Sequence, residues 1–229
     1  MKINNPFSTL NRFELGLWLV SMAVIVGCTI ASPAQGVLSM IASLIGVTAL
    51  IFIAKGQVIG QFLLIGFAIF YGAISFSFRY YGEVITYLGM SAPMAVIATV
   101  QWIRHPYQNS SQVKVGKLTK GKIIAVALLT AAVTVAFYFI LRALGNENLI
   151  VSTLSIATSF AAASLTALRS PYYAIGYALN DIVLIALWVM ACMKDISYLS
   201  MVICFVVFLI NDSYGYISWR RMEQRQKGE

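Results

Sequence analysis

The sequence predicts an all-α integral membrane protein with eight transmembrane helices, arranged as an N-terminal helix followed by a 3+1+3 core of parallel repeats. Three observations lead to this prediction: the composition, the spacing of the apolar segments and the distribution of the basic residues. Of the 229 residues, 60% are hydrophobic and 10% are charged, with a mean hydropathy of +0.83. A soluble domain is about half apolar and about a quarter charged, so this composition is typical of a membrane protein.

Eight segments are long and apolar enough to cross a bilayer, which takes about 20 mostly apolar residues. They are 13–31, 36–54, 58–79, 84–104, 122–143, 149–168, 171–193 and 196–218. Turn or charge signals separate them, Ser32-Pro33 and Gly145-Asn146 among them. The polar segment from His105 to Gly121 is the only break with the composition of a true loop.

The first segment, 13–31, has two interpretations. The sequence Ser32-Pro33-Ala34 that follows it resembles the small-residue cleavage site of a signal peptide. The apolar stretch, however, runs for about 18 residues, which exceeds the usual 7–15 of a signal peptide. We therefore expect residues 1–31 to form a retained extra helix that stands outside the repeated core.

The basic residues are distributed unevenly between the loops. If the loop at 105–121 is cytoplasmic, 13 lysines and arginines fall on the inner side and only Arg79, Arg142 and Lys194 on the outer side. This is the bias of the positive-inside rule, and one missed helix would invert every later loop. We therefore predict a multi-pass protein of the cell membrane with both termini cytoplasmic. The net charge of +8 then reflects orientation rather than nucleic-acid binding, with attraction to anionic lipid as a secondary effect.

The two groups of three helices before and after segment 122–143 can be aligned with each other. One offset of 117 residues pairs Trp102 with Trp219, Arg104 with Arg221 and Tyr71 with Trp188. Because a single helix separates the groups, both run in the same direction across the membrane. We predict five regions: the extra helix (1–31), a first repeat (36–104), a basic loop and linker helix (105–143), a second repeat (149–218) and a basic tail (219–229).

Aromatic residues near helix ends usually lie at the membrane–water interface. Trp102 and Trp219 each lie two residues or fewer from an arginine at a predicted cytoplasmic boundary. We therefore expect both tryptophans to be interface anchors.

Nothing in the sequence predicts catalysis, a metal centre or a bound cofactor. Cys28, Cys192 and Cys204 lie in apolar runs without metal-ligand spacing, which is typical of small buried hydrophobic residues. The single histidine, His105, belongs to the basic loop, and no nucleophile–base pair or nucleotide-binding loop accompanies it. We expect the protein not to be an enzyme.

Apart from Glu14, which is expected at a membrane interface, two carboxylates fall inside predicted spans, each directly after an asparagine, as Asn180-Asp181 and Asn211-Asp212. Ionisable groups within a membrane are costly, so such residues are candidates for a functional site. At the helical rise, Asp181 lies about 15 Å and Asp212 about 9 Å from the cytoplasmic end of its helix. Both pairs are therefore expected between the midplane and the cytoplasm.

Three helices carry stripes of aromatic and polar residues three or four positions apart, which share one helix face. Lipid disfavours such faces, so we expect them to turn inward. The residues expected to contact a solute are Gln61, Tyr71, Tyr177, Asn180, Asp181, Trp188, Asn211 and Tyr214. Asp212 and Gln57 are expected to form a gate or helix–helix contacts. A purely structural role for the amides, joining helices by hydrogen bonds, is the competing interpretation.

These side chains suggest the chemistry of a solute. Aromatic faces stack on flat rings and attract cations, amides pair with a carboxamide or hydroxyls, and a carboxylate favours a positive charge or a sugar hydroxyl pair. No arginine cluster lies within the spans, so a phosphate group is not expected to enter. The predicted partner is a small, flat, polar molecule that is uncharged or cationic.

Three patches of sequence resemble the PnuC-type vitamin transporters, a family best known for nicotinamide riboside. The segment from Phe208 to Met222 resembles the final helix of that family. Gly176 to Asp181, with Leu187-Trp188, is similar to the preceding helix, and Pro93 to Arg104 is similar to the end of the first repeat. The layout of residues 36–222 agrees with the family. Tyr173 and Tyr177 stand where many relatives have tryptophans, which bears on the identity of the vitamin.

The resemblance implies a 3+1+3 fold related to the small sugar transporters, often as a homotrimer. It implies facilitated diffusion of nicotinamide riboside for NAD synthesis, with trapping by cytoplasmic phosphorylation. The family also includes transporters of thiamine, riboflavin and deoxynucleosides, so these solutes remain alternative substrates. The residues also leave open a proton-coupled symporter, with Asp181 or Asp212 as the proton site, and a membrane scaffold without transport.

Overall fold

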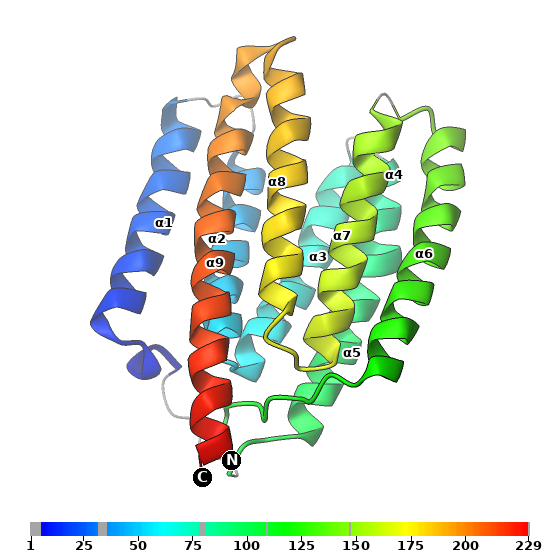
Figure 1. Cartoon of the computed structure of the whole chain (residues 1–229). Helices are drawn as coiled ribbons and strands as arrows, with labels where there is room; N and C mark the ends of the chain where they lie inside the picture. Colours follow the sequence, from blue (N-terminus) through cyan, green and yellow to red (C-terminus); the bar gives the residue numbers. More distant parts are fainter. Residues whose placement is uncertain (1–5, 32–35, 78–80, 109, 147, 229) are drawn as a thin grey trace.

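The computed structural model (Figure 1) describes the whole chain except residues 1–5, 32–35, 78–80, 109, 147 and 229. Its elements are η1 (Pro6–Thr9), α1 (Arg12–Ala31), α2 (Gly36–Ala54), α3 (Val58–Ser77), α4 (Tyr81–Val84), η3 (Ile85–Ser91), α5 (Ala92–Arg104), α6 (Lys120–Ala143), α7 (Leu149–Ala167), α8 (Tyr173–Cys192), η4 (Ile196–Tyr198) and α9 (Leu199–Gly228). Within the described ranges every regular element is a helix, and only isolated β-bridges occur besides, which confirms the predicted all-α class.

The helices match the predicted spans closely. Seven stretches are long and apolar enough to cross a membrane, and α3 adds a shorter described apolar stretch, Val58–Ala73. α4, η3 and α5 together form one of the seven, with a π-helical turn at η3. The predicted basic tail is not separate, because α9 continues to Gly228. Glu223 pairs there with Arg220 at 2.6 Å and Lys227 at 2.7 Å, along one helix face.

Six of the helices form a closed ring. α2 packs on α3, α3 on α5, α5 on α7, α7 on α8 and α8 on α9, and α9 returns to α2. α6 packs mainly on α7, and α1 packs on α2 and α9 from outside. The ring therefore joins the first group of three helices to the second, with α1 and α6 peripheral, as Figure 1 shows. This arrangement is compatible with the predicted 3+1+3 organisation.

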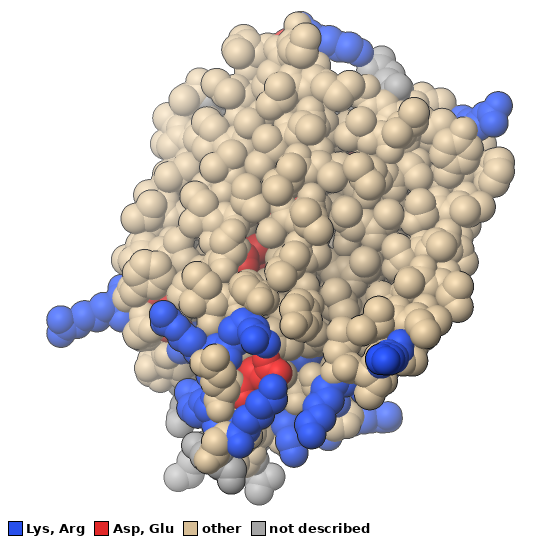
Figure 2. Space-filling model, viewed as in Figure 1, with Lys and Arg blue, Asp and Glu red and all other residues tan. Residues whose placement is uncertain are grey.

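Most of the visible basic side chains gather at one end of the molecule, the end at which α1 begins and α9 ends (Figures 1 and 2). We call this the basic end. The turn between α2 and α3, the turn between α7 and α8, and the loop of residues 105–119 all lie there. The far end carries the turn between α6 and α7 and the turn between α8 and α9.

The loop 105–119 runs across the basic end as a strap. The N–H of Val113 donates to the Gly56 carbonyl at 2.8 Å, and the N–H of Gly116 donates to the Arg169 carbonyl at 2.8 Å. The Gln226 side chain of α9 accepts from Val115 N–H and donates to the Val113 carbonyl. The strap therefore binds both inter-helix turns and the end of α9 together.

Trp102 and Trp219 are not interface anchors, contrary to the expectation from the sequence. Both are completely buried, and their ring centroids lie 5.4 Å apart at the basic end of the ring. Trp102 Nε1 donates to the Thr166 carbonyl in α7 at 2.9 Å, and Trp219 Nε1 donates to the Ile53 carbonyl in α2 at 2.8 Å. Each tryptophan ends one group of three helices and binds the first helix of the other group, so the two bonds are reciprocal.

Close helix contact is secured by a glycine where α7 meets α8. A Cβ atom on Gly176 would lie 2.9 Å from the Cα and Cβ atoms of Ala162 in α7. Any larger residue would push the helices apart, because backbone atoms cannot move away as a flexible side chain can. Small residues at helix interfaces are the usual means of close packing within membranes. This contact sets the position of α8, and with it Asn180 and Asp181, which lie a turn further along.

Candidate solute-binding site

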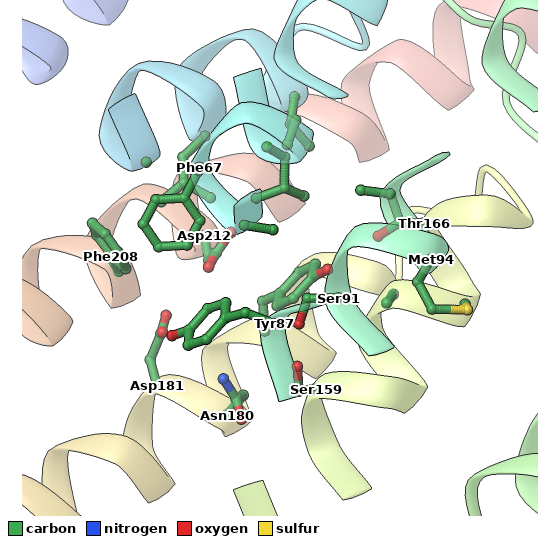
Figure 3. A pocket seen from close by; sticks show the side chains of 18 of the residues that line it. Phe67, Tyr87, Ser91, Met94, Ser159, Thr166, Asn180, Asp181, Phe208 and Asp212 are labelled. Carbon is green, nitrogen blue, oxygen red and sulfur yellow. The ribbon is translucent and has the colours of Figure 1, made fainter. Parts of the chain in front are cut away.

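A cavity of about 150 Å³ lies inside the ring (Figure 3). Its described walls come from α2, α3, η3, α5, α7, α8 and α9, and neither α1 nor α6 contributes to them. The polar and tyrosine residues that line it are Ser43, Gln61, Tyr71, Tyr87, Ser91, Ser159, Thr166, Tyr173, Tyr177, Asn180, Asp181 and Asp212. No lysine, arginine or histidine occurs among its described lining residues.

Asp181 of α8 and Asp212 of α9 face each other in this cavity. Both are buried, at 4% exposure each, and Figure 3 shows them pointing into the cavity from neighbouring helices. Their carboxyl groups are within hydrogen-bonding range of one another, so the two can share one proton. Oδ2 of Asp181 has no hydrogen-bond partner in the described structure. The pair therefore offers acceptors, and negative charge when the shared proton leaves, to a molecule in the cavity.

Asn180 is held in place by α7. Its Oδ1 accepts hydrogen bonds from Ser155 Oγ at 3.1 Å and from Thr158 Oγ1 at 3.0 Å. Because the oxygen is occupied in this way, the NH₂ group is the end of the amide that is available to a ligand. Figure 3 shows its nitrogen turned toward the cavity. Asn180 is thus positioned to donate to a carbonyl or a hydroxyl.

Gln61 of α3 is the clearest unpartnered polar group. It is completely buried and lines the cavity, yet neither Oε1 nor Nε2 has a hydrogen-bond partner in the described part of the chain. A buried amide left unsatisfied costs about 1–3 kcal/mol, so most buried amides are bonded. An amide that can both donate and accept at a cavity wall matches a ligand that carries an amide of its own.

Aromatic rings line the remaining wall. Tyr71 and Tyr87 have ring centroids 4.5 Å apart, and Phe67 lies 5.7 Å from Tyr71 and 5.9 Å from Tyr87. Across the basic end, Tyr173 packs edge-on against Trp219 at 5.1 Å and near Tyr177 at 6.2 Å. The cavity therefore combines ring-stacking surfaces with the carboxyl pair, as expected for a flat solute.

Two residues expected to contact a solute lie elsewhere. Asn211 donates from Nδ2 to Ser21 Oγ in α1 at 3.0 Å and to the Val207 carbonyl at 2.8 Å. The Tyr214 hydroxyl donates to Glu14 Oε1, also in α1, at 2.6 Å. Both occupy the face of α9 that packs on α1, so neither lines the cavity. The sequence placed Asn211 at the solute and Asp212 at the gate, whereas it is Asp212 that faces the cavity.

Gln57 and Trp188 lie at opposite ends of the site. Gln57 Nε2 donates to Thr9 Oγ1 at 2.7 Å, and its backbone forms a β-bridge with Gln112 of the strap. It therefore contributes to closure of the basic end. Trp188 lines a second cavity of about 180 Å³ toward the far end, which shares walls with the first, Tyr71 and Asn180 included.

The fourth predicted span contributes residues to the site that were not predicted from the sequence. Tyr87 and Ser91 line both cavities, and both belong to the π-helical segment η3. A π-helical turn adds a residue and shifts the face that later side chains occupy relative to the residues before it. The available signal was the spacing of Tyr87, Ser91 and Met94, which resembles the stripes on the other helices. Thr166 and Ser159 of α7 were missed because hydroxyls within an apolar run commonly bond their own helix.

Comparison with known proteins identifies the family of this chain. Residues 36–221 match the family model described as the nicotinamide mononucleotide transporter, which is most of the chain. The chain belongs to this family. It is therefore a multi-pass membrane transporter rather than an enzyme or a scaffold, and α1 lies outside the matched region.

Individual relatives agree with the family assignment. The chain is 24% identical over 228 residues to a protein of Neisseria mucosa named nicotinamide riboside transporter PnuC, covering 97% of this chain and 86% of the relative. It is 24% identical over 191 residues to a PnuC of Haemophilus influenzae, covering 82% of this chain and 81% of the relative. A crystal structure of the vitamin B3 transporter PnuC superposes with a TM-score of 0.79 at 22% identity, covering 95% of this chain and 94% of that one, which confirms the fold.

Proposed function

We propose that this transporter carries nicotinamide riboside across the cell membrane by facilitated diffusion, for NAD synthesis. The observation that carries the proposal is the carboxyl pair Asp181–Asp212, enclosed by six helices in a cavity with no described basic residue in its walls. Nicotinamide riboside has a cationic pyridinium ring, a carboxamide and ribose hydroxyls. The carboxyl pair matches the cation or the hydroxyls, Gln61 and Asn180 match the carboxamide, and the tyrosines match the ring.

The same cavity favours the riboside over its phosphorylated form. Phosphate recognition usually employs arginine, lysine or the N-terminus of a helix. Two buried carboxyl groups would instead repel a phosphate across a medium of low dielectric. The family model is described by the mononucleotide and the relatives are named for the riboside. The two carboxyl groups of this cavity, without a described basic residue, support the riboside as the solute.

We further propose that the basic end faces the cytoplasm, with both termini there. The concentration of Lys and Arg at that end supports this orientation. Phosphorylation by a cytoplasmic kinase would then trap the solute, because the anionic product would not re-enter the cavity. A homotrimer, as the family resemblance implies, is part of the proposal and is tested by the mass of the purified protein–detergent complex.

Binding to the purified protein in detergent tests the solute. Isothermal titration would compare nicotinamide riboside with the mononucleotide, thiamine, riboflavin and a deoxynucleoside. Tight binding of the riboside and about 100-fold weaker binding of the mononucleotide are expected, since like-charge contacts cost several kcal/mol. Thiamine is the strongest competitor because it is also cationic and flat. Binding of only one of the other solutes would overturn the choice of substrate.

Uptake into proteoliposomes tests the mechanism. Facilitated diffusion predicts that the riboside equilibrates without accumulation and that an imposed pH gradient does not drive uptake above equilibrium. Uphill uptake driven by an inward proton gradient would instead show that the proton shared by Asp181 and Asp212 is co-transported. The membrane potential must be held at zero with a potassium ionophore, because the riboside is itself a cation.

A further inference from the structure

The second cavity, of about 180 Å³, is not explained by a single solute-binding site. It lies between α3, α4, η3, α6, α7, α8 and α9, with Asn146 of the turn between α6 and α7 in its wall. That turn belongs to the far end of the molecule, so the cavity lies between the first cavity and that end. Tyr71, Tyr87, Asn180 and Leu184 line both cavities. We call the first the inner cavity and the second the outer cavity.

One carboxylate lies in the outer cavity. Glu83 of α4 lines it, and Glu83 Oε2 accepts a hydrogen bond from Ser75 Oγ of α3 at 2.9 Å. No other acidic residue and no lysine or arginine occurs among the described lining residues, and no ion pair of Glu83 occurs in the described structure. The Ser75 bond fixes the carboxylate at the wall and leaves Oε1 without a cationic neighbour among those lining residues.

Aromatic rings line the same cavity and the wall that it shares with the inner cavity. Trp188 lines the outer cavity from α8, about 10 Å along the helix from Asp181. Tyr71 and Tyr87, with ring centroids 4.5 Å apart, stand in the wall that the two cavities share. Tyr87 belongs to the π-helical segment η3, which begins two residues after Glu83. Such segments are frequent at functional sites because the helix can change register there.

We propose that the outer cavity is a staging site for the cationic ring of the solute. Glu83 attracts the cation, Trp188 receives its flat face, and the molecule then passes the Tyr71–Tyr87 pair to reach Asp181 and Asp212. This inference rests on the proposed function, since it takes nicotinamide riboside or another flat organic cation as the solute. It adds a second binding position and a residue, Glu83, that selects for positive charge on entry.

A staging site speeds entry and exit without changing the affinity of the inner cavity. The test is Glu83→Gln, with Asp195→Asn as the matched control. Asp195 is an exposed carboxylate at the same end that bonds the Ser197 N–H, which asparagine can also do. For Glu83→Gln, kcat/KM for riboside uptake into proteoliposomes should fall about fivefold to tenfold, the usual effect of removing a steering charge. The dissociation constant in detergent should stay within about twofold, and Asp195→Asn should change neither quantity.

The reduced riboside, dihydronicotinamide riboside, supplies an uncharged probe of nearly the same shape. Its uptake should be equal for wild type and Glu83→Gln. The proposal is overturned if the variant loses uptake of both ribosides equally, if the dissociation constant rises as much as uptake falls, or if Asp195→Asn has the same effect. Normal uptake of the cation by Glu83→Gln would also overturn it.

Wild-type protein gives a second measurement that does not depend on the variant folding. The ratio of cationic to reduced riboside uptake should fall as salt rises from about 20 to 500 mM, because salt screens the partly exposed Glu83 far more than the buried Asp181 and Asp212. A ratio that does not change with salt would contradict the staging site. If the wild-type protein binds neither riboside, the proposed function itself fails, which separates the two outcomes.

Discussion

Asn211 and Asp212 are adjacent in the chain but face different parts of the molecule. Asn211 Nδ2 lies 3.0 Å from Ser21 Oγ of α1, whereas Asp212 lines the inner cavity beside Asp181. Consecutive residues of a helix point about 100° apart, so only one of the two can face the ring interior. α1 is therefore bonded to the reverse side of the helix that supplies a carboxyl group to the site.

Because Asn211 and Asp212 face different surroundings, substitutions of the two residues should have different effects, and each serves as the control for the other. Asp212→Asn should weaken binding of nicotinamide riboside by about tenfold or more, because it removes charge next to the cation. Asn211→Ala should leave affinity within about twofold but lower the free energy of unfolding by about 1 kcal/mol, the usual value of a lost hydrogen bond. Isothermal titration and thermal unfolding in detergent measure the two effects. An affinity loss in Asn211→Ala with normal binding by Asp212→Asn would reverse the assignment of these faces.

The unpartnered amide of Gln61 predicts opposite changes in stability and binding. Gln61→Leu should weaken riboside binding about tenfold while leaving the ligand-free protein as stable as before, or more stable by up to about 1 kcal/mol, because a buried unsatisfied amide is removed. The control is Gln57→Leu, four residues earlier and just before α3, which loses the bond to Thr9. It should lose stability and keep affinity. A loss of ligand-free stability in Gln61→Leu would mean that the amide bonds within the protein.

The reciprocal tryptophans at the basic end predict a coupled loss of stability. Trp102→Phe and Trp219→Phe each remove one indole bond to a helix carbonyl and should each lower the free energy of unfolding by about 1–2 kcal/mol. Since the rings are in contact, the double variant should depart from additivity by about 0.5 kcal/mol or more. Chemical or thermal unfolding of the wild type, the two single variants and the double variant completes this double-mutant cycle. Strict additivity would show that the two halves of the ring are closed independently.

A buried ionic contact fastens the extra helix to the core. Glu14 of α1 is 2% exposed and lies 3.0 Å from Lys55 Nζ, and it also accepts from the Tyr214 hydroxyl. Glu14→Gln should lower the free energy of unfolding by about 3 kcal/mol, because it leaves a partly buried ammonium without its partner.

The control for Glu14 is Glu223→Gln, which breaks only surface pairs within α9 and should cost about 0.5 kcal/mol or less. Thermal unfolding in detergent compares the two variants. Equal unfolding midpoints for Glu14→Gln and Glu223→Gln would mean that this contact of α1 adds nothing to the stability of the core. Limited proteolysis after residue 31 would then report whether α1 detaches while the ring stays folded.

The sequence was sufficient to predict the helix count, because length and hydropathy are local properties that the bilayer requires of every span. It also identified the two intramembrane aspartates, because charge within an apolar run is conspicuous without any structure. Helix faces were predictable where a stripe was regular, as for Gln61 and Tyr71 on α3. The contribution of Tyr87 in η3 was not predicted, although its spacing to Ser91 and Met94 is that of a helix stripe.

The burial of Trp102 and Trp219 could not be predicted from the local sequence. A tryptophan beside an arginine at a helix end has the same local sequence whether it lies in the interface or inside the bundle. Their burial follows from the strap and from the meeting of the two helix groups, and both depend on residues more than 50 positions away.

The sequence by itself determined that this chain has eight apolar helical segments, that its basic residues gather in the loops of one side, and that Asp181 and Asp212 are carboxylates well inside the spans. Only the tertiary structure decided that Asp212 rather than Asn211 meets Asp181, that Tyr214 bonds α1, and that Glu83 and Trp188 line an outer cavity. The physical reason is that hydropathy constrains each helix separately, whereas its rotation depends on which neighbours bond its polar groups. α1 supplies Ser21 and Glu14 as partners for one face of α9, and these bonds turn Asp212 toward the inner cavity.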